Sequence, residues 1–171
     1  YLMQEGITDV DIGLFYPHLN YNYKQIHEED LAGGYLEGFD SIPLKGPINW
    51  FKRKERTETD RIISKQQDLA QIMTDNAYYY THINEESIIN GEIKGGALIV
   101  GYARLKCLIF QDIDNISVEL AKRLSELVQN NVHLIFIESV PNRQSGFFNW
   151  EENDKIICDV FNDIKSNANF H

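Results

Sequence analysis

The sequence predicts an α/β domain whose mostly parallel sheet carries helices on both faces. Apolar segments with the composition of strands alternate with segments of helical periodicity, which favours right-handed crossovers between parallel strands. Two of the strand segments, residues 105–110 and 132–137, are nearly continuous apolar runs, as is typical of strands covered on both faces. The length of 171 residues and the hydrophobic content of 43% fit a single domain, residues 1–171, with a core of its own.

The first strand is expected at residues 10–16, a β-rich segment that ends before Pro17 because proline cannot donate to a strand ladder. Residues 17–56 then form a long loop insertion that is rich in aromatic residues and has no sustained period. The rings argue against disorder, since they need a surface to bury against, either in this domain or in a neighbour. They include Tyr21, Tyr23, Tyr35, Phe39, Trp50 and Phe51.

Three helices follow from apolar residues at helical spacing. The first runs from Thr57 or Thr59, with Thr59 as its N-cap, to Asn76. The second is capped by Ser117 and ends around Asn130. The third is the last element of the chain, and its apolar positions are Ile156, Ile157, Val160, Phe161 and Ile164.

The remaining β structure lies between the first two helices. A second strand is expected at residues 77–81 and a single helical turn at residues 85–89. Residues 92–94 and 97–100 flank Gly95-Gly96, a pair that suits a two-residue primed turn and predicts a small β-hairpin. The order of elements predicts a flavodoxin-like domain with three layers.

Charge and composition exclude several classes of protein. Acidic residues outnumber basic ones by 26 to 16, and the formal net charge of −10 disfavours nucleic acid and anionic membranes as partners. No apolar run is long enough for a membrane helix, so a soluble chain is expected. The chain begins at Tyr1 rather than at methionine, which suggests a segment of a longer polypeptide.

Polar residues follow each predicted strand, where open α/β sheets bind their ligands. The candidates for binding are His18, Tyr21, Tyr23, Trp50, His82, Asp112, Glu138 and Arg143, with Asn20, Gln111, Asp114, Ser139 and Asn142 beside them. The competing interpretation is that strand ends and loops are polar because their backbone must be solvated. Asp112 and Asp114 can likewise be read as a pair of catalytic carboxylates, or as groups that cap the next helix or are simply solvated.

Motifs for specific chemistries are missing. The first strand is followed by Tyr16-Pro17-His18 rather than by the glycine-rich turn that binds dinucleotides. The third parallel strand runs into Gln111-Asp112 and not into a small-residue turn that holds Ser or Cys, so no nucleophile elbow is present. No catalytic residue and no cofactor are therefore assigned.

Neither the cysteines nor the histidines indicate a site. Cys107 and Cys158 fall at core positions of a strand and a helix and are expected to be packing residues. The five histidines show no spacing typical of zinc ligands, so no metal is assigned. The basic cluster at residues 52–56 is interpreted as a solvated face or a contact with an acidic partner.

Several segments are similar to a known family. They are residues 1–17, which end in Tyr16-Pro17, residues 83–93 and 102–109 around Asn90-Gly91, and residues 117–138 with Pro141-Asn142-Arg143-Gln144-Ser145-Gly146 and Asn153-Asp154. Together they resemble the glutamine-amidotransferase-like accessory domain of large bacterial glycoside hydrolases, nearest the α-L-rhamnosidase type. The trimerisation domain of certain β-galactosidases is the next most similar. The resemblance covers residues 1–16 and 75–164, so the loop insertion stays unmatched.

This resemblance implies a class I glutamine-amidotransferase-like domain, excised from a larger protein, that packs on a catalytic (β/α)8 barrel of the same polypeptide. It implies a non-catalytic role in shaping the sugar cleft or in assembly, which includes homo-oligomers. A saccharide could then stack on the rings of the insertion, although these rings could equally form a satellite core. The parent protein is expected to be secreted or periplasmic in a bacterium. The alternative is a stand-alone flavodoxin-like module that binds or hydrolyses a small molecule at the strand ends.

Overall fold

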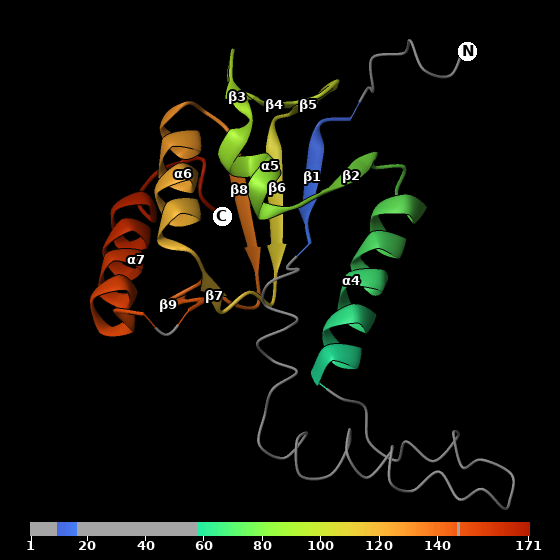
Figure 1. The fold of residues 1–171 in the computed structure, drawn as a ribbon. Helices are drawn as coiled ribbons and strands as arrows, with labels where there is room; N and C mark the ends of the chain where they lie inside the picture. The colour runs from blue at the N-terminus through green and yellow to red at the C-terminus, as the bar shows by residue number, and fades with distance from the viewer. Residues whose placement is uncertain (1–9, 17–57, 147) are drawn as a thin grey trace, which may run out of the picture.

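A computed structural model describes residues 10–16, 58–146 and 148–171 of the chain (Figure 1). At its centre lies a four-stranded sheet in the order β2-β1-β6-β8, and each neighbouring pair is parallel. The strands are β1 (Ile12–Phe15), β2 (Tyr80–Ile83), β6 (Cys107–Gln111) and β8 (His133–Ile137). The predicted α/β class with a mostly parallel sheet is confirmed, and the strand order is compatible with a flavodoxin-like fold. The insertion at residues 17–56 lies outside the described residues.

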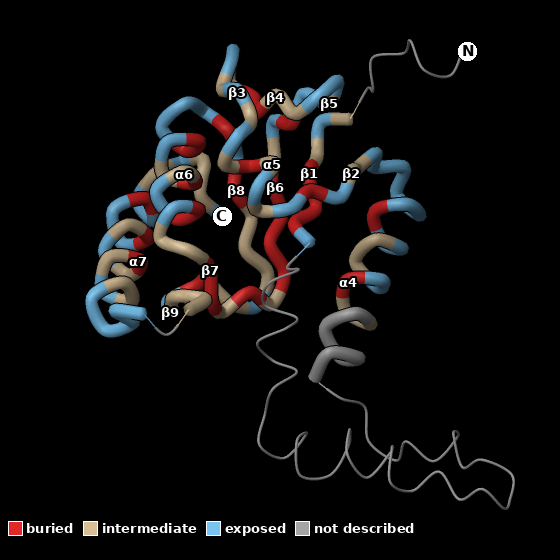
Figure 2. Tube along the Cα trace, in the orientation of Figure 1, coloured by how far each residue is buried: buried red, intermediate tan, exposed pale blue. Residues whose placement is uncertain are grey.

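Both faces of the sheet are apolar, because alternate residues of each strand point to opposite sides. On β6, Leu108 and Phe110 belong to the larger core, whereas Cys107 and Ile109 pack with the smaller one. A row of phenylalanine rings crosses the larger core from Phe15 through Phe110 to Phe136, with centroids 4.8 and 4.9 Å apart. Burial is deepest along β1 and β6 (Figure 2).

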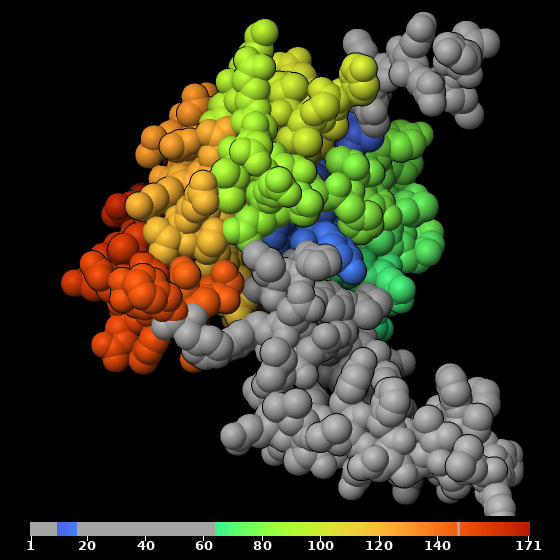
Figure 3. All heavy atoms as spheres, in the orientation of Figure 1, coloured from blue at the N-terminus to red at the C-terminus, as the bar shows by residue number. Residues whose placement is uncertain are grey.

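The helices form the two outer layers. Helix α4 (Glu58–Asp75) covers the smaller core with Leu69 and Met73. Helices α5 (Glu85–Asn90), α6 (Val118–Gln129) and α7 (Trp150–Ile164) cover the other face. In the space-filling view, α5 and the neighbouring short strands close over the sheet between α6 and β2 (Figure 3). The structure therefore has three layers, with a single helix on one side in the described part of the chain.

The predicted helices are found close to their expected bounds. Ser117 caps α6 as predicted, since its hydroxyl oxygen accepts a hydrogen bond of 3.0 Å from the amide of Leu120. Helix α7 buries Ile157, Phe161 and Ile164, the spacing on which its prediction rested.

The predicted hairpin is also confirmed. Strands β3 (Glu92–Ile93) and β4 (Leu98–Val100) pair antiparallel, and the turn between them places Gly95 and Gly96 at φ values of 57° and 71°. Positive φ at both central residues is what a type I′ turn requires.

Three boundaries differ from the prediction. Residues 105–110 are not one strand: Leu105 ends β5 (Ala103–Leu105), which pairs with β4, and the amide of Lys106 bonds to the Asp11 carbonyl before β6 begins. Strand β2 starts at Tyr80 rather than at residue 77, because Ala77 has a φ of 59° in the turn that closes α4. Residues 115–116 and 143–144, expected in loops, form the parallel pair of β7 (Asn115–Ile116) and β9 (Arg143–Gln144).

The end of the chain adds a short fifth segment to the sheet. Phe170 forms a parallel bridge with Leu134 of β8, and the amides of Leu134 and Phe136 donate to the carbonyls of Asn169 and His171. The ring of Phe170 stacks on that of Phe136 at 5.2 Å. The tail thus seals part of the edge that β8 would otherwise leave unpaired.

Replacement of Gly13 tests how tightly β1 is packed. A Cβ atom at this position would lie 2.7 Å from Cδ2 of Leu108 and 3.0 Å from Cδ1 of Leu105. We expect Gly13→Ala to lower the free energy of unfolding by about 1–3 kcal/mol, the usual cost of overpacking. Gly146→Ala is the control, because its Cβ would meet nothing closer than 3.4 Å. Equal midpoints of urea unfolding for the two variants would contradict the packing described for β1.

Candidate functional site

The carboxyl ends of the parallel strands gather polar groups at one edge of the sheet. Strands β1, β6 and β8 end at the bottom of Figure 1, where α4, α6 and α7 begin. The chain leaves β1 toward β2 on one side, and it leaves β6 toward β8 on the other. The gap between β1 and β6 is therefore the topological switch point, where open α/β sheets bind ligands.

A cluster of three charged side chains lies at this edge. Lys65 of α4 places Nζ 3.2 Å from Oδ2 of Asp112, which follows β6, and also pairs with Oε2 of Glu138, which follows β8. The exposed fractions of the side chains of Asp112, Lys65 and Glu138 are 11%, 25% and 44%. Charges that are partly removed from water interact more strongly than charges on an open surface. The cluster joins α4 to the ends of two strands.

The backbone at both carboxylates is unusual. Asp112 has a φ of 54° and Glu138 a φ of 74°, which places both in the left-handed region. Residues other than glycine rarely adopt it, and such positions cluster at functional sites. The amide of Asp112 donates to the carbonyl of Ile137 at 3.0 Å, which ties the two strand ends together.

Unsatisfied polar atoms mark the same edge. Four buried side-chain oxygens in the described part of the chain have no hydrogen-bond partner, and all four belong to residues at or after the ends of β6 and β8. They are Oε1 of Gln111, Oδ1 of Asn115, Oγ of Ser139 and Oε1 of Gln144. Buried oxygens of this kind are rare, because each loses its hydrogen bonds to water. Their concentration here distinguishes the edge from a merely solvated loop region.

The structure brings together only some of the predicted binding residues. Asp112 and Glu138 meet through Lys65, whereas His18, Tyr21, Tyr23 and Trp50 lie outside the described residues, and their role stays a prediction. Sequence reasoning missed Lys65, which is 47 and 73 positions from its partners. The signal that could have found it is the crossover itself, since a helix that returns from β1 starts beside the carboxyl edge.

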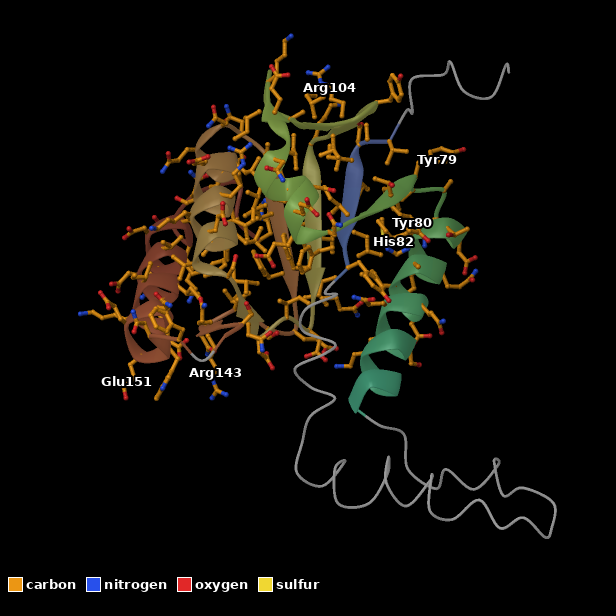
Figure 4. The ribbon with its side chains drawn as sticks, in the orientation of Figure 1. Tyr79, Tyr80, His82, Arg104, Arg143 and Glu151 are labelled. Atoms are coloured by element: carbon orange, nitrogen blue, oxygen red, sulfur yellow. The ribbon has the colours of Figure 1, made fainter. Side chains whose placement is uncertain are left out.

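His82 and Arg143 lie in short strands rather than in loops, and their role in binding stays a prediction. His82 is inside β2, level with Leu14 of β1, and its ring makes edge contacts with Tyr80 and Tyr16. Arg143 is exposed on β9 and points away from the body of the molecule, as does Glu151 of α7 (Figure 4). Neither side chain has a recorded contact with the Lys65 cluster. The sequence placed both residues in loops because strands as short as β2 and β9 show no clear period.

The helix-capping interpretation of Asp112 is not what the structure shows. Ser117 caps α6, and β7 separates Asp112 from that helix. Asp112 instead takes the position that a nucleophile elbow would give to Ser or Cys, a residue with positive φ directly after a buried strand. At this position the chain has a carboxylate paired with a lysine and neither a thiol nor a hydroxyl.

Of the two cysteines, Cys107 packs against a core cluster as expected, and both are partly buried. Cys107 lies on β6 against the smaller core, and burial raises the pKa of its thiol from 9.0 to about 11. Cys158 is partly buried on α7 with Sγ 3.6 Å from the carbonyl oxygen of Asn142. At neutral pH the Cys107 thiol is protonated and therefore a poor nucleophile.

Other kinds of site receive little support from the described residues. Within the described ranges, no three His, Cys, Asp or Glu side chains are grouped so that they could hold a metal ion. The same part of the chain contains no helix long and apolar enough to cross a membrane. A shallow hollow between α5 and β4, lined by Ser87, Asn90 and Val100 among others, lies away from the strand ends.

The strength of the Lys65 cluster can be measured by a double-mutant cycle. We expect Lys65→Met and Asp112→Asn to show a coupling energy of about 1 kcal/mol in the free energy of unfolding. Asn is chosen because it tolerates positive φ. The matched control is the pair of Lys106 and Asp11, at 3.0 Å, whose side chains are 52% and 54% exposed and should couple by less than about 0.5 kcal/mol. Equal couplings would show that the cluster is an ordinary surface pair.

Alkylation of Cys107 should depend on pH in a defined way. In a Cys158→Ser variant, the rate of alkylation by iodoacetamide should stay low at pH 8 and rise until about pH 11, because the thiolate is the reactive form.

The raised pKa of Cys107 also predicts how the free energy of unfolding depends on pH. The contribution of the protonated thiol is present below about pH 9 and is lost as the pH rises toward 11, since the unfolded chain loses its proton first. A Cys107→Ala variant should lack this pH dependence of stability. An alkylation rate that levels off near pH 8 would contradict the raised pKa of Cys107.

The chain was compared with known proteins in three ways. No family model, no curated protein and no solved structure matches it.

Proposed function

We propose that this chain is a non-catalytic accessory domain of a bacterial carbohydrate-active enzyme, an α-L-rhamnosidase-like glycoside hydrolase. In this proposal it packs on the catalytic (β/α)8 barrel of the same polypeptide and helps to shape the sugar cleft or to assemble the enzyme. The parent protein would be secreted or periplasmic. The sequence resemblance described above suggests the family, and the geometry of the strand ends supports the non-catalytic role.

The finer fold assignment belongs to the same proposal. We assign the domain to the flavodoxin-like, class I glutamine-amidotransferase-like type. Support comes from the parallel order β2-β1-β6-β8, to which the tail at Phe170 adds a parallel bridge on the far side of β8. In the order of the chain this is the 2-1-3-4-5 arrangement.

The observation that carries the non-catalytic role is Asp112. It occupies the elbow after β6 at a φ of 54° and is paired with Lys65, so the place of an amidotransferase nucleophile holds a carboxylate in an ion pair. Cys107, the nearest thiol in the chain, lies five residues earlier in the strand and has a raised pKa. Amide hydrolysis through a cysteine is therefore not proposed.

A second candidate is a stand-alone module that binds or hydrolyses a small molecule at the strand ends. The pairing of Asp112 and Glu138 through Lys65 favours it, because two carboxylates at a switch point could act as acid and base. This candidate requires turnover by the chain alone.

The proposal predicts the context and the activity of the chain. The complete open reading frame should encode a (β/α)8 barrel, and the 171-residue chain should release neither an aryl leaving group from aryl glycosides nor ammonia from glutamine. The chain should also co-sediment with the separately produced barrel, which retains its catalytic carboxylates. The control for the activity assays is the complete enzyme. Turnover by the chain that is lost in Asp112→Asn and Glu138→Gln would favour the second candidate, and a reading frame without a barrel would refute the first.

A further inference from the structure

Next to Asp112 in the chain is a buried side-chain oxygen atom without a hydrogen-bond donor. Gln111 is the last residue of β6 and is 8% exposed, and its Oε1 is one of the four unpartnered oxygens of the described residues. Strand alternation places its side chain on the same face as Cys107 and Ile109, the face that α4 covers. Lys65 reaches across from α4 to the residue that follows Gln111.

The exposure of these side chains falls in steps toward the interior. Glu138 is 44% exposed, Lys65 25% and Asp112 11%, and Gln111 is almost fully buried. Ranked by exposure, the four residues run from solvent to the end of β6, and we call this series the polar path. A path made only of ion pairs would need no buried amide at its end.

The donors and acceptors along this path define the ligand that fits. The oxygens of Gln111, Asp112 and Glu138 accept hydrogen bonds, and Lys65 donates them. Among the described residues, a free anion would meet two carboxylates beside one ammonium group that is paired with both, and a cation would compete with Lys65 itself. A neutral molecule with several hydroxyl groups can donate to the acceptors and accept from Lys65 without adding charge.

We propose that Lys65, Gln111, Asp112 and Glu138 form a binding site for a small, neutral, polyhydroxylated molecule. The left-handed backbone at Asp112 and Glu138 turns both carboxylates toward Lys65, so the arrangement is built before any ligand arrives. The inference rests on the proposed function only in its choice of sugars as probes, and it needs no contact with a barrel.

The position of Gln111 makes a sharp test available. A buried acceptor without a donor destabilises the folded chain, whereas an apolar side chain of similar size does not. Gln111→Leu should therefore raise the midpoint of thermal unfolding while it removes a ligand contact. A purely structural glutamine would give the opposite change in stability.

The experiment is an amide NMR titration of the 171-residue chain with D-galactose, D-mannose and L-rhamnose. We expect saturable shifts of the amides of residues 111–115 and 138–140 with at least one sugar. Inorganic phosphate and ethanolamine serve as the anionic and cationic probes and should not shift these amides. Saturable shifts with either of them and none with a sugar, or no shifts at all, would overturn the proposal.

The variants connect the binding to the named residues. Gln111→Leu should lower the affinity for the sugar at least tenfold, which corresponds to about 1.4 kcal/mol of binding free energy. The control is Gln129→Leu on the exposed side of α6, which should leave the affinity unchanged. Glu138→Gln, at the exposed end of the path, provides a second variant if Gln111→Leu does not fold. Unchanged affinity in a folded Gln111→Leu, or in Glu138→Gln where that variant is needed, would overturn the proposal. Failure of sugar binding in a chain that still co-sediments with its barrel would refute only this inference, and the reverse outcome would refute only the proposed function.

Discussion

The row of phenylalanine rings across β1, β6 and β8 is the interaction on which the other features depend. Phe110 stacks on Phe136 at 4.9 Å, and Phe136 meets Phe161 of α7 edge to face at 5.4 Å. Offset and edge-to-face pairs of this kind add to the free energy gained from burial alone. They fix the register of three strands and dock the larger helical layer in the same step. The alternate residues Leu14 and Ile109 then have to face α4.

This constraint explains why polar groups concentrate at the strand ends. Because β6 is buried on both faces, its interior positions are apolar, and Gln111 at its last position is the first place for a polar side chain. The same holds for β8, where Glu138 directly follows the strand. Parallel pairing brings these two ends together, and Lys65 of α4 supplies the cation. The site is thus a consequence of the topology of the sheet as much as of any local motif.

The sequence predicted the long elements, in which apolar residues repeat several times, but it did not predict the shortest strands. Helix α6 was predictable because Leu120, Leu124 and Leu127 repeat at helical spacing behind a serine cap. Strands β7 and β9 have two residues each, too few for any period, and exist because tertiary contacts bring Asn115 beside Arg143. The break at Lys106 was hidden for a similar reason. The apolar run continues through it, and only the bonds of the backbone to Asp11 separate β5 from β6.

The candidate site shows the same division. Asp112 and Glu138 could be selected from their places after apolar strands, and the structure joins them. Lys65 could not be selected, because a lysine on an amphipathic helix looks the same whether it faces water or a carboxylate. Whether Gln111 finds a partner is likewise a matter of three-dimensional packing. Local sequence patterns therefore predicted the two acidic residues of the cluster. Lys65 and the unpartnered Gln111 could be identified only from the fold.

Stability and function make opposite demands on this edge. Two residues other than glycine at positive φ and an orphaned amide oxygen each destabilise the folded chain, whereas the phenylalanine core a few ångströms away is well packed. A sequence under no constraint except stability would place glycine or asparagine at position 112 and an apolar residue at position 111. Sites that depart from local rules in this way are expected where a bound molecule supplies the missing interactions. The folded chain tolerates this loss of stability because the rest of β6 is packed on both faces. The strain is therefore limited to the residues after the strand.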